Sequence, residues 1–415
     1  MNSFVVRAFA DEQGDSADSD GVDMTKRIAV VGGGIAGAMV VSLLERWNAE
    51  RAEKSALVWI RGRSGASALS SGVLDADEDE ILTGTTRNIF AELTGATLDN
   101  CFVATDIGTF REAKGRLPQI LLLPRARGRI LVASGFIGFD AKHLSRSLYD
   151  DAKRVGSALA FEPTRRNLRE RTEERHMSGA SLAAAFDLAE RQALLLQSLR
   201  EELQYARTQS DLPVVGVLFP PVLGIRTNLA ALLTGQLGLP VGEVVGGVSG
   251  PYAARYEAMM EPLRARVTAV EGWVTGCELR DSAISLAVVK TGEDDAQGIH
   301  ACDKLVLATG GLVGGGFSYA GGQWIGASPT PSHARSTFRS SLIEPTGVDL
   351  PGSLFGEAPE SLAWPYVSGD RMRHLAATSP DPSRVWVVGA LNGKASWLSC
   401  VKDAERVVAE LTRNP

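Results

Sequence analysis

Closely spaced cysteines are missing from this sequence. Its four cysteines, Cys101, Cys277, Cys302 and Cys400, lie far apart and form no CxxC pair. Iron–sulfur clusters and structural zinc sites use cysteines in close groups, and disulfide-rich domains carry many more of them. The spacing predicts no metal site and no disulfide framework, and we expect reduced thiols in a cytosolic protein.

A long apolar run and an excess of basic residues are also missing. No apolar stretch reaches the roughly 18–20 residues that a membrane span needs. Lys and Arg number 43 against 49 Asp and Glu, a net charge of -6. We therefore expect no nucleic-acid partner, and contact with a membrane only through other proteins. The expected location is cytoplasmic, or peripheral at the inner face of the cell membrane.

The first 25 residues are acidic and polar, with six Asp and Glu between positions 11 and 23. They lack the basic and apolar regions of a secretory signal. We interpret residues 1–25 as a disordered acidic tail.

A strand–helix–strand unit follows this tail. Residues 27–31 form a short apolar run that ends in glycines, which is typical of a buried parallel strand. Residues 35–47 have apolar residues at helical spacing, and residues 56–60 form a second buried strand. This is the setting in which a glycine fingerprint is informative.

The turn after the first strand reads Gly32-x-Gly34-x-x-Gly37. In such a turn the first glycine permits the tight bend, the second lets the backbone approach phosphates, and the third allows close helix–strand packing. The free N–H groups around Ile35 and Ala36 then face an anion at the positive end of the helix. The sequence predicts cofactor binding here, and the alternative is a purely structural turn.

The acid that such sites use to bind the adenosine ribose is missing. The second strand ends in Arg61-Gly62. This argues against an ordinary NAD site, and Arg61 is a candidate to bind a phosphate. The alternative is an arginine that faces solvent.

Two stretches of small residues are further candidates for cofactor contact. The loop at residues 64–72 contains Ser70-Ser71-Gly72, whose hydroxyls and small side chains suit a planar ring. As composition alone it would be a flexible loop. A late strand at residues 304–308 leads into Thr309-Gly310-Gly311, which again permits close approach of a ligand or a neighbouring strand.

The fold class expected is α/β. A discontinuous Rossmann-like FAD/NAD(P)-binding domain would comprise residues 26–105 and 284–415. An inserted α+β cap domain would comprise residues 106–283, where a basic patch at 124–129 precedes a strand and charged helical residues run from 167 to 207. A terminal strand at 385–388 and a helix at 399–412 complete the pattern.

Several segments together resemble the accessory flavin subunit of the anaerobic glycerol-3-phosphate dehydrogenase, a flavoprotein related to the fumarate reductase and succinate dehydrogenase flavoproteins. They extend from residue 27 to the terminal helix in the order of that family. They are VVGGGIAG, SALSSGVLD ending at Asp75, GTFR (108–111), SGFIGFDAKHL (134–144), PPVLGIR (220–226) and LATGGLVGGG (307–316).

The resemblance implies a subunit of a membrane-associated, quinone-linked dehydrogenase complex. A catalytic FAD-containing subunit would oxidise glycerol 3-phosphate, and an iron–sulfur subunit would pass electrons to quinone. The present chain would bind a flavin, FAD or FMN, and relay electrons between them.

One departure from this family lies near the C-terminus. Other flavoproteins have a strand ending in glycine and then a long glycine-rich run before a helix that faces the flavin. Here that run is short and keeps only Gly389 and Gly393, so Lys394 or Trp397 could occupy the space.

Two side chains are candidates for chemistry beyond what the flavin supplies. His143 in the FDAKHL stretch is a candidate proton donor, and Arg226 of PPVLGIR a candidate anion clamp; the alternatives are a structural histidine and an ion pair. No metal-ligand spacing is present.

Three functions follow from these observations. The first is the electron-relaying flavin subunit. The second is a scaffold or assembly subunit that keeps the fold without the cofactor. The third is a stand-alone flavin oxidoreductase with a small substrate of its own.

Overall fold

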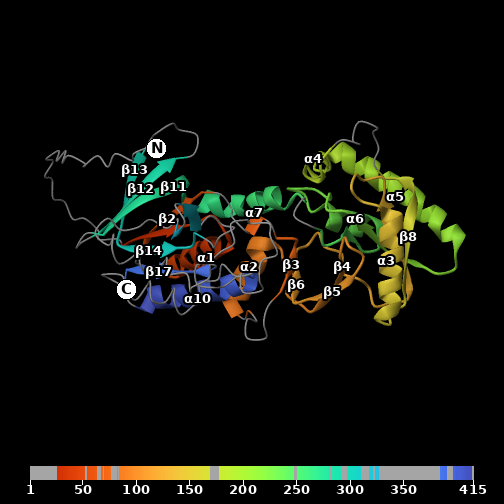
Figure 1. Ribbon diagram of the computed structural model, residues 1–415, viewed down its shortest axis with the longest axis horizontal. Coiled ribbons are helices and arrows are strands. Elements are labelled where there is room, and N and C mark those ends of the chain that lie inside the picture. The colour runs from red at the N-terminus through yellow and green to blue at the C-terminus, as the bar shows by residue number, and fades with distance from the viewer. Residues whose placement is uncertain are drawn as a thin grey trace.

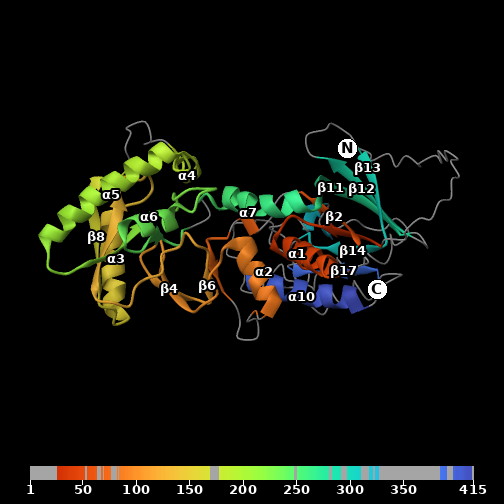
Figure 2. The same cartoon turned by 180° about the vertical axis from the view of Figure 1, so that it is seen from behind.

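The chain folds into two lobes joined by one long helix. The computed structural model describes residues 26–51, 54–62, 67–68, 70–75, 82, 84–168, 177–246, 250–279, 283–290, 297–309, 317–320, 323–326, 384–389 and 396–413. Figure 1 shows the lobes along the long axis, with helix α7 (Tyr252–Arg266) running between them. Figure 2 shows the same arrangement from behind. We call residues 26–94 with 252–413 the first lobe and residues 101–245 the second lobe.

The first lobe is built on a mixed sheet. Its described strands follow the order β13–β12–β11–β2–β1–β14–β17. Their bounds are β1 (Arg27–Val31), β2 (Ala56–Arg61), β11 (Thr268–Leu279), β12 (Ile284–Lys290), β13 (Gln297–Cys302), β14 (Lys304–Leu307) and β17 (Val385–Val387). Strands β11, β2, β1, β14 and β17 pair in parallel, whereas β11–β12 and β12–β13 are antiparallel. The parallel centre brings the carboxyl ends of β1 and β2 to one edge, where ligand sites of such sheets lie.

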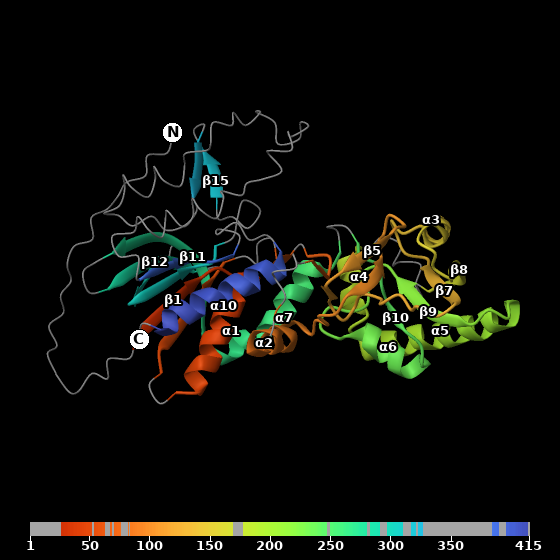
Figure 3. The same ribbon diagram turned by 90° about the horizontal axis from the view of Figure 1, so that it is seen from below.

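Helices cover one face of this sheet. They are α1 (Ile35–Ala49), α2 (Gly84–Thr94), α7 and α10 (Trp397–Arg413). Figure 3 shows α1 and α10 side by side on that face. Their apolar side chains pack on Val30 and Val306, while Leu286 and Val288 of β12 pack with Ala29 on the other face. Burial on both faces explains the continuous apolar runs, and the expected strand–helix–strand unit and terminal helix are confirmed.

The second lobe is a smaller α/β unit. Its four described main strands pair in parallel in the order β10–β9–β7–β8. The strands are β7 (Gly128–Ser134), β8 (Leu159–Asn167), β9 (Val214–Phe219) and β10 (Val241–Glu243), and the helices are α3 (Ala141–Arg154), α4 (Gly179–Ala185), α5 (Ala189–Gln209) and α6 (Leu229–Leu237). The α+β cap expected from the sequence is thus an α/β unit, because helices connect its successive strands and make them parallel.

The chain returns to the first sheet earlier than expected. Strand β11 pairs with β2 from Thr268 onward, and α7 packs in the first-lobe core before it. Both lie inside the range 106–283 that the sequence assigns to the inserted domain. The boundary expected at residue 283 is late because the elements at residues 252–266 and 268–279 were not identified from the sequence.

Short strands lie near the junction of the lobes, and one pair of them links the lobes. They are β3 (Val73–Leu74), β4 (Cys101–Ala104), β5 (Phe110–Ala113) and β6 (Gly115–Arg116), which form the antiparallel pairs β3–β6 and β4–β5. A further antiparallel pair consists of β15 (Phe317–Ala320) and β16 (Gln323–Gly326).

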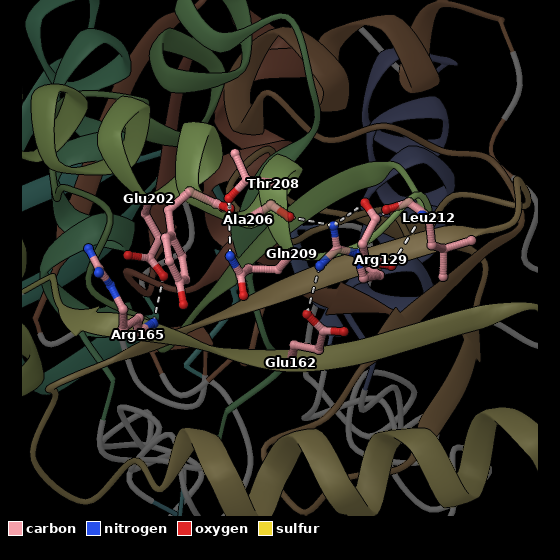
Figure 4. A network of polar contacts seen from close by, with 10 residues as sticks. Arg129, Glu162, Arg165, Glu202, Ala206, Thr208, Gln209 and Leu212 are labelled. Carbon is pink, nitrogen blue, oxygen red and sulfur yellow. Dashed lines mark hydrogen bonds and ion pairs between the residues drawn. The ribbon is translucent and has the colours of Figure 1, made fainter.

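The basic patch at residues 124–129 divides in the structure. Arg125 and Arg127 are exposed, whereas Arg129 is buried and 2% exposed. Its guanidinium donates to the carbonyl oxygens of Ala206 and Leu212, each at 2.8 Å, and pairs with Glu162 at 3.0 Å (Figure 4). Arg129 therefore fixes the end of α5 to β7 and β8, and its charge is used inside the lobe.

Within the described part of the chain no helix is long and apolar enough to cross a membrane. The same residues contain no group of three His, Cys, Asp or Glu side chains placed to hold a metal ion.

Candidate functional site

The glycine turn has the backbone geometry that the fingerprint requires. Gly32 has φ +135°, and a Cβ added there would overlap the carbonyl oxygen of Ala308. A Cβ on Gly37 would overlap the carbonyl oxygen of Gly32. The indole N–H of Trp59 on β2 donates to the Gly32 oxygen at 2.8 Å and holds the turn in place. Only glycine fits at these two positions, because β1, α1 and β14 approach one another so closely.

Two side chains close over this turn. Gly34 precedes α1 and supplies no side-chain cap, so the Ile35 N–H donates to Ser67 Oγ at 2.9 Å. The Tyr256 hydroxyl donates to the Gly33 carbonyl oxygen at 3.0 Å and is hydrogen-bonded to the Ser67 side chain. Burial raises the pKa of Tyr256, so the phenol stays protonated and remains a donor. The Ile35 amide, which the fingerprint would present to a phosphate, is thus bonded to a neutral hydroxyl.

Two other predicted cofactor residues serve the packing around the turn. Gly389 has φ +76°, and a Cβ there would lie 2.6 Å from the Ala36 Cβ. Its N–H donates to Asp403 of α10 at 2.8 Å. Gly389 thus lets the end of β17 approach α1 and α10. Thr309 is half-buried after β14, while Gly310 and Gly311 lie outside the described residues.

Arg61 is engaged in ion pairs at the end of β2. Its side chain is 1% exposed, and it pairs with Glu257 at 2.5 Å and Glu271 at 3.4 Å. Its guanidinium also lies over the Trp59 ring, 5.1 Å from the centroid. A buried guanidinium needs counter-charges, and these glutamates supply them. Arg61 is therefore held by ion pairs, its contact with a phosphate stays a prediction, and Gly62 follows it as the strand ends.

A narrow pocket lies at the junction of the lobes, with room for little more than a water molecule. The loop after β2 contributes Ser70, Ser71 and Gly72 to its lining. Helices α7 and α10 contribute Tyr252, Arg255, Tyr256, Met259 and Trp397. Leu117, Gln119 and Ile120 complete the lining. The predicted serine loop is thus brought to the pocket.

Arg255 connects the pocket to the second lobe. Its guanidinium makes bonds of 2.7 and 2.8 Å to the two carboxylate oxygens of Glu243, which is completely buried. It also donates to the Gly224 carbonyl oxygen at 2.7 Å, and Glu243 accepts from the Leu223 N–H. Buried charges are stable only when paired and hydrogen-bonded, and this pair meets both conditions.

The predicted catalytic residues do not line the pocket. Arg226 is exposed and forms a bidentate pair with Glu261 of α7, at 2.5 and 2.7 Å, which raises the pKa of Arg226. His143 is exposed in the first turn of α3, where its N–H donates to the capping Asp140. The structure therefore does not bring His143 and Arg226 together at the candidate site.

Residues of the serine loop, GTFR and PPVLGIR contact one another or residues that line the pocket. Asp75, at the end of the serine loop, pairs with Arg111 of GTFR. The Gly72 carbonyl accepts from the Leu117 N–H at 2.7 Å, and Gly224 of PPVLGIR accepts from Arg255.

Sequence reasoning missed the contribution of α7. Tyr252, Arg255, Tyr256 and Met259 fall at helical spacing along one face of this helix and reach the pocket. A signal was present in the sequence. Tyr252 and Tyr256 follow a proline and lie four residues apart, so they share one face of a helix.

Comparisons with known proteins add only distant likenesses. No protein-family model matches the chain, and no curated protein matches it. It is similar to a flavin-dependent halogenase from Xanthomonas campestris at 11% identity, covering 94% of this chain and 71% of that one with a TM-score of 0.30. A flavin-dependent halogenase from Brevundimonas sp. BAL3 gives 16% identity, 72% and 46% coverage and a TM-score of 0.23. A tetracycline destructase gives 12% identity, 69% and 39% coverage and a TM-score of 0.21.

The chain spans less than half the length of the last two structures. At these TM-scores the likeness assigns neither a fold nor a function to this chain. Both are inferred from the residues and contacts of the chain itself.

Proposed function

We propose that this chain is the flavin-binding subunit of a membrane-associated dehydrogenase complex similar to anaerobic glycerol-3-phosphate dehydrogenase. It would relay electrons from a catalytic FAD-containing subunit to an iron–sulfur subunit and then to quinone. The observation that carries this proposal is the set of contacts made by two residues of α7 that line the pocket with the serine loop: Tyr256 bonds to Gly33 of the glycine turn, and Arg255 bonds to Gly224.

The residues around the turn fit the phosphate of a flavin nucleotide. The N-terminus of α1 has no side-chain cap from its own N-cap residue, and its Ile35 amide is satisfied only by Ser67 of a neighbouring loop. A phosphate oxygen is a stronger acceptor than this hydroxyl and would be favoured by the helix dipole. Ser67 and Tyr256 are both donors and would then turn toward the phosphate.

The residues fit adenosine less well. Arg61 stands where the ribose-binding acid of dinucleotide sites is found, and a guanidinium has no acceptor for ribose hydroxyls. Its ion pairs with Glu257 and Glu271 also close that end of β2. The chemistry at this position therefore supports a phosphate at the turn more strongly than an adenosine beyond it.

A bound flavin would supply one- and two-electron chemistry. The chain would bind and orient it. Ser70, Ser71 and the Gln119 amide would supply hydrogen-bonding groups, and Tyr252, Met259 and Trp397 would exclude water. The described pocket is narrow, so entry of a ring requires the serine loop and α7 to separate.

The relay role is tested in the assembled complex. The chain is co-purified with its partner subunits, and quinone reduction by glycerol 3-phosphate is compared between complexes carrying the wild-type chain and a Gly34→Val chain. The proposal predicts assembly of both complexes and slow quinone reduction only with Gly34→Val. Equal rates from equally assembled complexes would exclude a relay through this site.

A scaffold subunit without cofactor is the second candidate. The observation that favours it is the Ile35 N–H, which a phosphate would use and which Ser67 already satisfies. It predicts that the purified chain is folded, joins its partners and contains no flavin. A stand-alone flavin oxidoreductase, the third candidate, predicts turnover by the isolated chain.

A further inference from the structure

One face of helix α3 carries three cations around a tyrosine. Lys142, Arg146, Tyr149 and Lys153 lie four, three and four residues apart, and this spacing places them on one side of the helix. All four side chains are exposed, whereas the apolar residues of the opposite side are buried in the core of the second lobe. We call these four residues the α3 stripe.

The cations of the α3 stripe are not paired inside the chain. A neighbouring arginine of the same helix, Arg154, pairs with Asp151 at 2.7 Å. Within the described part of the chain, the three cations of the stripe form no ion pair. The Lys153 amine instead lies over the Tyr149 ring, 4.1 Å from its centroid. The three charges are therefore available to an anionic surface outside the chain.

Two acids on or beside α3 lie near the stripe. Asp140 is engaged as the helix cap, because its carboxylate accepts from the N–H groups of Lys142 and His143 at 3.0 Å each. Asp150 is exposed on the adjoining side of the helix. Three cations against these two acids leave an excess of positive charge at the stripe.

Apolar groups are exposed beside these charges. Tyr149 is 40% exposed, and Ile137, on the loop that leads into α3, is 56% exposed. Cations with exposed aromatic and aliphatic side chains are typical of surfaces that lie on anionic lipid. Figure 1 shows α3 at the end of the second lobe that lies away from the first lobe. A membrane could therefore approach the stripe without meeting the first lobe.

We propose that the α3 stripe binds the headgroups of an anionic membrane directly, with Ile137 at the lipid boundary. The chain then has a membrane contact of its own, in addition to the contact through partner subunits that the sequence predicts. Attraction between basic side chains and anionic lipid is electrostatic and is screened by salt. The inference does not depend on flavin binding.

The test is co-sedimentation of the purified full chain with lipid vesicles at low salt. We expect binding to vesicles of phosphatidylcholine with phosphatidylglycerol, no binding to phosphatidylcholine alone, and release at high salt. Lys142→Glu with Arg146→Glu should weaken binding at least about tenfold. The matched control is Arg125→Glu with Arg127→Glu, which reverses two exposed charges in the loop before β7 and should bind like wild type.

A gain of binding provides a second test, which loss of the fold cannot imitate. Asp150→Asn removes the acid that adjoins the stripe and should bind anionic vesicles more tightly than wild type. Equal weakening in the two double variants would overturn the proposal, as would a wild-type chain that binds no vesicles at low salt. Binding to polyglutamate but not to anionic vesicles would also overturn it and assign the stripe to an acidic protein segment.

Discussion

Tyr256 donates its hydroxyl hydrogen to the carbonyl oxygen of Gly33 at 3.0 Å, so a side chain of α7 closes over the glycine turn. The preceding residue, Arg255, is bonded to Glu243 and Gly224 of the second lobe. Two consecutive residues of one helix are thus bonded to different lobes. Helix α7 sets the width of the pocket between them.

The Tyr256 hydroxyl contributes to stability as well as to the site. Tyr256→Phe leaves the buried Gly33 oxygen without this donor, and we expect the free energy of unfolding to fall by about 1–2 kcal/mol. Urea unfolding measures it. Tyr149, which is 40% exposed on α3, is the control, and Tyr149→Phe should change stability by less than about 0.5 kcal/mol. Equal losses in the two variants would contradict the assigned bond.

Alanine substitutions at two helical glycines, Gly37 and Gly235, should change the free energy of unfolding in opposite directions. A Cβ at Gly37 overlaps the Gly32 oxygen, so Gly37→Ala should lower the free energy of unfolding by about 1–3 kcal/mol. Gly235 lies inside α6, and a Cβ there meets no atom within 4 Å. Gly235→Ala should raise stability by about 0.5–1 kcal/mol. Thermal unfolding of both variants checks the signs, and a stabilised Gly37→Ala would refute the packing.

The buried pair of Glu243 and Arg255 predicts a large effect. Glu243→Gln leaves the guanidinium buried without its counter-charge, which typically costs about 3–5 kcal/mol. The exposed Arg226–Glu261 pair gives the control, because solvent screens it and Glu261→Gln should have a small effect. Denaturant unfolding of both proteins is compared. Similar small losses would show that Glu243 is not required as an anion.

Asp151 predicts a pH dependence on the acid side. The side-chain hydrogen bond from Arg154 and then the Phe110 N–H, each at 2.7 Å, lower the pKa of its carboxyl. Such a group stabilises the fold above its unfolded pKa of about 3.9 and loses this contribution as pH falls through the folded pKa. Asp151→Asn should therefore be less stable than wild type near neutral pH.

The difference between wild type and Asp151→Asn should shrink as the pH falls below about 4. Urea unfolding over a pH series measures it, with Asp150→Asn on the exposed side of the same helix as the control. A stability difference that grows toward acid pH would contradict a lowered pKa of Asp151.

The first lobe could be predicted because its signals are local. Apolar strands, helical spacing and the glycines at positions 32, 34 and 37 all lie within a few residues of the features that they specify. Gly389 and Ser70–Ser71 can also be identified as special positions from local composition. The structure places Gly389 in tight packing with Ala36 and the serines at the pocket.

The pocket-lining residues of α7 and the ion pairs of Arg61 could not be predicted in the same way. Arg61 is neutralised by Glu257 and Glu271, about 200 residues away in sequence, and no local pattern specifies such pairs. The same holds for Arg255, whose partner Glu243 lies on a strand of the other lobe. Patterns in sequence give elements and turns, whereas pairing of distant charges depends on how the lobes pack.

The most direct test of the account is the absorbance spectrum of the purified chain, followed by chromatography of what denaturation releases. The account predicts a flavin band near one flavin per chain and release of FMN or FAD. A colourless chain that is folded, and that takes up neither FMN nor FAD on addition, would contradict it and favour the scaffold function.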